Sequence, residues 1–459
     1  MATSSFILRR VPGRRKTLLG VATLVAAVAV ACGGDSDAAQ PNSNSTLSPA
    51  TTVSPGSSTL PTPVPSGIPT PATVSSEDGL LAQLGPAERA FASRLVQSGW
   101  KTDLTRFADD LDVGNILSGG VPRDGIGSID APRFSPVSEA PSYLRADEPV
   151  IVLDLNDDVR AYPLSIMMWH EIVNDVVGDE PVTVTFCPLC NTSLVFPRTL
   201  EDGTVLEFGV SGFLLNSDLI MYDRQTESLW QQITGRGMIG THSGTQLDFL
   251  PVSITAWSDF STSFPDGQVL LRPTITERHS VTGRSLARNY ELPPYAGYDS
   301  INSSPFLFDG PLDGRLLPME RVATVALGDL EVAYPFSFLA EQPVVNDVIG
   351  EIPITVFFDD GTESAFTGRS GNFSKSGSTT LFNRTVDDLV LTFALEDGVI
   401  KDNETGSTWN KFGKALEGEL EGARLEPIVH AAHFWFAWAA FSPDTVIRGS
   451  VEMLTLETG

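Results

Sequence analysis

The chain has 459 residues, more than one hydrophobic core usually accommodates, which predicts two domains or a fused pair. Its 57 acidic and 30 basic side chains give a net charge of −27, and such a surface repels phosphate backbones, so we expect no nucleic-acid partner. The sequence contains no Gly-x-Ser-x-Gly, P-loop or dinucleotide-binding motif, and these enzyme classes are therefore not indicated.

Residues 1–31 have the pattern of an export signal of the lipoprotein type. Arg14, Arg15 and Lys16 precede the apolar run "TLLGVATLVAAVAVA", which is short for a spanning helix. Cys32 follows directly, as in a bacterial lipobox, and we expect it to be lipidated. The protein would then be extracytoplasmic and anchored to the membrane of the cell envelope through Cys32. A signal peptide cut nearby and an uncleaved anchor are the alternatives.

Residues 32–78 are rich in Ser, Thr and Pro, with almost no charge and no aromatic residue. Such a segment buries too little apolar surface to offset the entropy of ordering it. We predict a disordered tether between the membrane anchor and a folded body.

A lead-in segment, residues 79–145, opens the folded body with helical spacing over residues 80–97, where Pro86 marks a break or a first turn. Beyond it the pattern predicts mostly strands. "VIVLDLNDDVRAYPL" alternates around an Asn-Asp-Asp turn, and "PVTVTFC" is typical of a strand. "SIMMWHEIVNDVVG" is interpreted as one short helix with Ser165 as its N-cap, and "SLVFPRTLEDGTVLEFGVSG" as a hairpin turning at Asp202-Gly203.

Two stretches of the chain repeat each other at a constant offset of 172 residues. "HEIVNDVVGDEPVTVTFCPLCNTS" and "QPVVNDVIGEIPITVFFDDGTES" each follow an Ala-Tyr-Pro, and further Trp, Gly and Pro landmarks recur in order. The sequence therefore predicts an α+β, strand-rich fold of two tandem, internally duplicated domains. The first repeat spans residues 146–272, a connection spans 273–318, and the second repeat spans 319–459.

Residues shared by both repeats are interpreted as parts of the fold, so the differences between the repeats are informative. His170, Cys187 and Cys190 of the first repeat are replaced by Gln342, Asp359 and Thr362 in the second. We expect any special chemistry to lie in the first repeat.

Several motifs resemble one bacterial family. "SGGVPRDGIGSIDAPRF", "AYPLSIMMWHEIVND", "TFCPLCNTSLVF", "SDLIMYDRQTESLWQQITG" and "FWFAWAAFSPD" occur in one order from about residue 100 to the C-terminus. They are similar to the family catalogued as domain of unknown function 3179. The resemblance implies a protein that is exported or lipid-anchored, and it implies no catalytic residues.

Cys187-Pro-Leu-Cys190 places two thiols in a tight turn, which is half of a tetrahedral metal site. We expect the remaining ligands to be His170 and one of His430 and His433, which share a face if their stretch is helical. The predicted cofactor is a transition metal, copper or zinc. The leading function is binding or delivery of a metal, or electron transfer.

Two other interpretations of the cysteine pair stay open. Export favours a structural Cys187–Cys190 disulfide in a non-catalytic envelope module that binds a ligand or has a structural role. A redox-active dithiol is the other, although "NTSLVF" after Cys190 predicts a strand instead of the helix that follows this motif in thioredoxin-like enzymes. No small-molecule or protein partner is indicated, and the pattern does not decide whether the protein is an enzyme.

Overall fold

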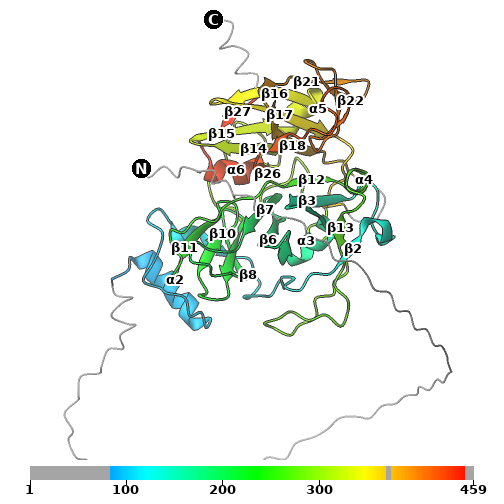
Figure 1. Ribbon diagram of the computed structural model, residues 1–459. Coiled ribbons are helices and arrows are strands. Elements are labelled where there is room, and N and C mark those ends of the chain that lie inside the picture. The colour runs from blue at the N-terminus through cyan, green and yellow to red at the C-terminus, as the bar shows by residue number, and fades with distance from the viewer. Residues whose placement is uncertain (1–82, 368–373, 450–459) are drawn as a thin grey trace, which may run out of the picture. The chain divides into compact units, whose positions relative to one another are not determined.

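The computed structural model describes residues 83–367 and 374–449 (Figure 1). Strands far outnumber helices in these residues and form several sheets, which confirms the predicted strand-rich fold. The predicted signal, Cys32 and the whole predicted tether lie outside the described residues. In the part that the structure describes, no helix has the length and apolarity needed to cross a membrane.

Helix α2 (Pro86–Gln97) forms within the range that the sequence predicted. Pro86 occupies the first turn, where its missing N–H costs no intrahelical hydrogen bond. Phe91 and Leu95 are buried with Trp100 against residues of a later sheet. Packing of this apolar face, more than helix propensity, holds the helix in place.

The first half of the fold, residues 116–270, is built from three sheets with the strand orders β12-β3-β4-β13-β2, β5-β6-β7 and β1-β8-β9-β10-β11. The strands are β1 (Ile116–Ser118), β2 (Phe134–Pro136), β3 (Pro149–Leu155), β4 (Asp158–Pro163), β5 (Ile172–Val177), β6 (Glu180–Cys187), β7 (Thr192–Pro197), β8 (Phe208–Leu215), β9 (Asp218–Asp223), β10 (Leu229–Gln231), β11 (Arg236–Ile239), β12 (Ser253–Ala256) and β13 (Gln268–Leu270). Helices α3 (Leu164–His170) and α4 (Trp257–Ser263) and the 3-10 turns Val113–Asn115 and Val137–Glu139 complete the described elements up to β13.

The second half, residues 321–447, contains sheets with the orders β26-β14-β15-β27, β16-β17-β18-β25 and β21-β22-β23-β24, and the pair β19-β20. Its strands are β14 (Arg321–Leu327), β15 (Leu330–Pro335), β16 (Val344–Ile349), β17 (Ile352–Asp359), β18 (Ser378–Asn383), β19 (Thr385–Val386), β20 (Leu389–Val390), β21 (Phe393–Glu396), β22 (Val399–Asp402), β23 (Thr408–Trp409), β24 (Ala415–Glu417), β25 (Glu426–Pro427), β26 (Ala431–Phe434) and β27 (Val446–Ile447). Helices α5 (Phe336–Glu341) and α6 (Trp435–Phe441) follow β15 and β26.

The strand pairings of the two halves correspond. The hairpin β3-β4 has an antiparallel neighbour, β12, and a parallel neighbour, β13. The hairpin β14-β15 is flanked in the same way by β26 and β27. A buried tryptophan on the third strand of each four-strand meander, Trp230 or Trp409, donates to an aspartate seven residues earlier, Asp223 or Asp402, over 2.9 Å.

The single helix expected over residues 165–178 was wrong in its second part. Helix α3 ends at His170, and Ile172–Val177 forms strand β5. Four of the six residues in β5 are Ile or Val, whose branched side chains favour a pleated strand. Ser165 is not the N-cap, since its hydroxyl donates to Glu148 Oε1 over 2.6 Å.

The hairpin expected between residues 193 and 212 was also wrong. Strand β7 pairs with β6, whereas β8 pairs with β9 and β1, so the two strands belong to different sheets. Only a local turn near Asp202-Gly203 remains, closed by the bridge between Thr199 and Val205. Local turn signals do not reveal which strand a segment finally pairs with, because the partner is chosen by packing elsewhere in the chain.

The two halves share part of one hydrophobic core. Phe366, Phe434 and Phe436 of the second half are buried in the same cluster as Phe186 of the first. The Phe434 N–H donates to the carbonyl of Cys190 over 2.9 Å. The turn that carries the cysteines is therefore held by both halves.

Candidate metal centre

Cys187 and Cys190 are fixed at a strand end and in a tight turn. Cys187 is the last residue of β6 and pairs with Thr192, the first residue of β7. Asn191 adopts a left-handed conformation, with φ of 55°, which asparagine tolerates better than most residues. Both cysteines are buried and free. The Cys187 thiol donates to the carbonyl of Ser217 over 3.6 Å.

Asp218 lies beside the two thiols. It begins β9 directly after the turn Asn216-Ser217, whose two residues have positive φ. The Ile233 N–H donates to Asp218 Oδ2 over 2.9 Å, and the Gln231 side-chain amide donates to the same oxygen. Asp218 Oδ1 is buried and has no hydrogen-bond partner among the described residues.

One donor atom from each of Cys187, Cys190 and Asp218 lies within 4.8 Å of the other two. At zinc bond lengths of about 2.3 Å to sulfur and 2.0–2.2 Å to oxygen, tetrahedral ligand atoms lie roughly 3.3–3.8 Å apart. Side-chain movements of about 1 Å would therefore bring the three donors to one ion. A fourth position would be left for water or another group, as in zinc sites with three protein ligands.

The electrostatics of this cluster are unusual because its members are all acidic. Burial raises the pKa of Asp218 to about 7 and raises the pKa values of both thiols. Glu171 is close enough to be affected, since burial and the Asp218 charge raise its pKa to about 8. No basic side chain of the described residues forms an ion pair or hydrogen bond with these groups. The cluster therefore has no counter-charge among the side chains of residues 83–367 and 374–449.

Glu171 has a conformation that non-glycine residues rarely adopt. It lies between α3 and β5 with φ of 59°, and its backbone carbonyl accepts from the Phe186 N–H over 2.8 Å. This kink ends the helix and turns the chain into β5. Strained backbone of this kind is often found at functional sites, and here it holds a buried carboxyl group near the cluster.

The connection between the halves covers the cluster. Tyr298 donates its hydroxyl to the Leu189 carbonyl over 3.1 Å, inside the cysteine turn. Ser217 donates to the Phe306 carbonyl. Tyr295 is partly buried, and burial followed by the charges of Glu171 and Cys187 raises its pKa. We call residues 290–308 the tyrosine segment.

His170 does not belong to the three-residue cluster. Its Nδ1 lies 2.7 Å from the Gly127 carbonyl and its Nε2 lies 2.7 Å from the Tyr290 hydroxyl. Burial lowers its pKa to about 4, so the ring is neutral at pH 7. In this arrangement His170 fastens the tyrosine segment to the first half.

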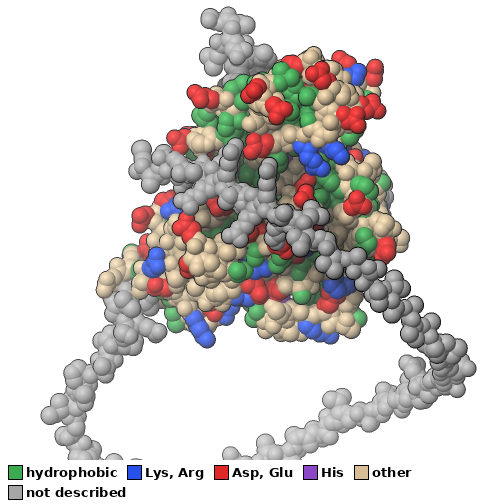
Figure 2. Space-filling view, viewed as in Figure 1, with side chains coloured by type: hydrophobic (Ala, Val, Ile, Leu, Met, Phe, Trp, Pro, Cys, Tyr) green, Lys and Arg blue, Asp and Glu red, His purple; other side chains and the backbone are tan. Residues whose placement is uncertain are grey.

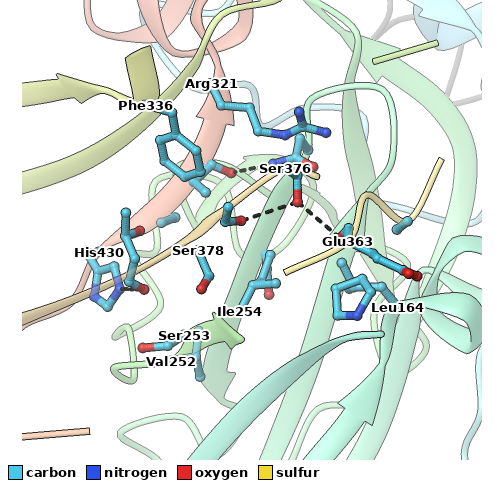
Figure 3. Close-up of a pocket in the computed structure, with 18 residues that line it drawn as sticks. Leu164, Val252, Ser253, Ile254, Arg321, Phe336, Glu363, Ser376, Ser378 and His430 are labelled. Carbon is cyan, nitrogen blue, oxygen red and sulfur yellow. Dashed lines mark hydrogen bonds between the residues drawn. The ribbon is translucent and has the colours of Figure 1, made fainter. Parts of the chain in front are cut away.

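His430 and His433 are likewise outside the cluster. The condition under which they would share a face, a helix through both residues, is not met, because β26 covers 431–434 and helix α6 begins only at Trp435. His430 Nδ1 lies 2.8 Å from the Ile428 carbonyl, and its ring lines a small cavity with Arg321 and Glu363 (Figure 3). His433 Nδ1 lies 2.7 Å from Thr192 Oγ1, and its ring stacks on Trp438.

Asp218 is the donor that sequence reasoning missed. It stands in the motif "SDLIMYDRQTESLWQQITG", but 28 residues separate it from Cys190 and acidic residues are common in this chain. Strand β9 begins with this acid directly after the turn Asn216-Ser217, but β4 begins with Asp158 in the same way after Asn156-Asp157, so the position alone gave no usable signal. The long separation hid the contact.

The fold and the cluster together define a strand-rich protein in which two buried thiols and a buried carboxyl group come together from the end of β6, the turn before β7 and the start of β9. The family model described as "Protein of unknown function (DUF3179)" matches residues 123–445, and the chain belongs to this family. The resemblance stated from the motifs is thereby confirmed. The comparisons found no similar curated protein and no similar solved structure.

Proposed function

We propose that this protein binds one transition-metal ion through Cys187, Cys190 and Asp218. The observation that carries the proposal is Asp218 Oδ1, a buried oxygen without a hydrogen-bond partner among the described residues, which lies beside two buried thiols. A buried acidic cluster without a basic partner is costly unless it stays protonated or holds a cation. A divalent ion would supply the missing positive charge and displace the protons.

Zinc fits the three donors better than copper. Two thiolates suit either metal, whereas a carboxylate is a harder ligand that zinc accepts readily. Among the described residues, no imidazole joins the cluster, so the donors there are two thiols and one carboxyl group. The role that these donors support is metal binding, in a site held by both halves of the fold.

The test is metal content and free thiols, measured on the full chain purified without chelator. We expect one equivalent of zinc per chain, lost in Cys187→Ser and in Asp218→Asn. Asp397→Asn is the matched control, because Asp397 is an exposed acid in the corresponding hairpin turn of the second half and should leave the metal in place. Absence of metal together with absence of free thiols at Cys187 and Cys190 would refute the proposal in favour of a structural disulfide.

We also infer that the two halves arose by duplication and that the ion is bound only by the first. The corresponding strand orders and the paired Trp–Asp contacts support this inference. The second half has Asp359 and Thr362 where the first has Cys187 and Cys190. A metal-to-protein ratio of two would contradict it.

We further propose that the chain is exported and anchored through lipidated Cys32. The basic residues, the apolar run and the cysteine near the N-terminus support this assignment. The measurement is detergent-phase partitioning of the expressed protein. Cys32→Ser should move it to the aqueous phase, and an unchanged partition would count against lipidation.

A further inference from the structure

The place in the second half that corresponds to the metal centre can be located from strand register. Ile172 pairs with Thr185 in the first half, and Val344 pairs with Phe357 in the second. Continuing each strand by the same number of residues makes Pro343 the counterpart of Glu171 and Asp359 the counterpart of Cys187. This correspondence does not depend on whether the first half binds a metal.

In the first half this place is filled by the protein itself. The tyrosine segment lies over it. The Tyr298 hydroxyl donates a hydrogen bond to the Leu189 carbonyl, and the Ser217 hydroxyl donates one to the Phe306 carbonyl. The covering element is an irregular stretch of chain, and its tyrosines Tyr290, Tyr295 and Tyr298 pack against the hydrophobic cluster that contains both cysteines.

In the second half an open cleft with a volume of about 580 Å³ occupies the corresponding place. Its lining includes Pro343 and Asp359, the counterparts named above, and Trp409 and Lys411. This volume is within the range of about 300–1,000 Å³ that is typical of ligand sites.

The walls of this cleft combine exposed apolar side chains with acidic groups. Leu395, Val399 and Leu416 line it and are 45%, 40% and 50% exposed. Asp359 and Asp360 line it as well. Large apolar side chains grouped at the mouth of a cleft are typical of an interaction site.

The charge around the cleft is negative. Exposed Asp397 and Glu417 neighbour its apolar walls in the chain, whereas the charge of exposed Glu396 is offset by Lys401 at 3.0 Å. Figure 2 shows acidic side chains spread over the region of β16, β21 and β22. The positive charge of Lys411 is already used in two ion pairs, because its ammonium group lies 2.6 Å from Asp259 and 3.1 Å from Asp359. A basic ligand is therefore favoured over an acidic one.

We propose that this cleft binds an extended peptide segment of a partner protein, with an aromatic side chain as anchor and a neighbouring Lys or Arg. We infer an aromatic anchor in the peptide because the tyrosine segment, with its aromatic side chains, fills the corresponding place in the first half. The basic requirement comes from the acidic rim. Apolar burial would supply most of the affinity, and the rim would set orientation and specificity.

The experiment is selection of displayed random peptides on the full chain, with removal of those that bind the Val399→Asp variant. Val399 is exposed to 40%, so this change should leave the fold intact while placing a charge on the apolar wall. Enriched sequences should contain an aromatic residue next to Lys or Arg. Their affinity, measured by fluorescence anisotropy, should fall at least tenfold in Val399→Asp and weaken with added salt.

Leu389→Asp is the control, because Leu389 is an exposed apolar residue on β20 that does not line the cleft. This variant should bind the selected peptides as the unchanged chain does. The proposal is overturned if no sequence is enriched, if the enriched sequences lack aromatic or basic residues, or if both variants bind equally well. Preferential binding of small amines over every peptide would also overturn it, and would identify the cleft as a small-molecule site.

Discussion

Replacing His433 by Gln should make the protein markedly less sensitive to acid. His433 is 2% exposed, and burial lowers the pKa of its ring to about 3. The ring contacts Thr192 on one side and stacks on Trp438 on the other, with ring centroids 5.2 Å apart. No carboxylate in the described part of the chain is paired with it, so protonation in the folded state is unfavourable.

The sign and size follow from proton linkage. The unfolded chain binds a proton at His433 near pH 6.5, whereas the folded state does so only near pH 3. Between these values the unfolded state holds more protons, so stability falls as the pH is lowered through the window. Lowering the pH from 7.5 to 4.5 should cost roughly 2–3 kcal/mol of unfolding free energy through this one residue.

The assay is urea unfolding of the full chain at pH 7.5 and 4.5, followed by tryptophan fluorescence. His433→Gln should lower stability modestly at pH 7.5, because it loses the stacking on Trp438, and should lose roughly 2–3 kcal/mol less than the unchanged chain between the two pH values. His242→Gln is the control, since His242 is only half-buried. Equal losses in the unchanged chain and in His433→Gln would refute the reasoning.

Three further predictions concern stability at pH 7.5. Glu171→Gly should be more stable than Glu171→Ala by about 1 kcal/mol in unfolding free energy, because only glycine adopts a φ of 59° without strain; equal values would contradict the strain argument. Gly212→Ala should lower the unfolding free energy by at least ~2 kcal/mol, since the added Cβ would lie 2.2 Å from a backbone carbonyl oxygen. Gly203→Ala, whose added Cβ meets nothing within 4 Å, should lower it by only about 1 kcal/mol, as measured by thermal unfolding. Tyr162→Phe should cost roughly 1–3 kcal/mol by urea unfolding, because it leaves the nearly buried Asp175 without a hydrogen bond of 2.7 Å; no change would show that water replaces the hydroxyl.

The boundary of helix α3 shows how far local patterns carried the fold prediction. Helical spacing continues through His170, so the first half of the expected helix was correct. The pattern did not reveal that Glu171 would adopt positive φ and redirect the chain into a strand. That conformation is set by contacts with β6. One of them is the hydrogen bond from the N–H of Phe186, fifteen residues further along the chain, to the Glu171 carbonyl.

The histidines show the same limit for the candidate site. Their residue type made them reasonable ligands, but the pattern could not show which groups their ring nitrogens contact. His170 lies against Gly127 and Tyr290, and His433 lies against Thr192, in each case across a large separation in sequence. The ligand prediction thus depended on contacts that only the folded chain defines.

The sequence by itself determined the family, the strand-rich class and the two thiols as the chemically distinctive residues of the first half. These follow from residue type, periodicity and order, which are local properties of the chain. The tertiary structure decided that Asp218 joins the thiols, that the histidines hold other positions and that the second half has an open cleft. Each of these depends on which distant segments pack together, and packing is set by the shared core of the two halves.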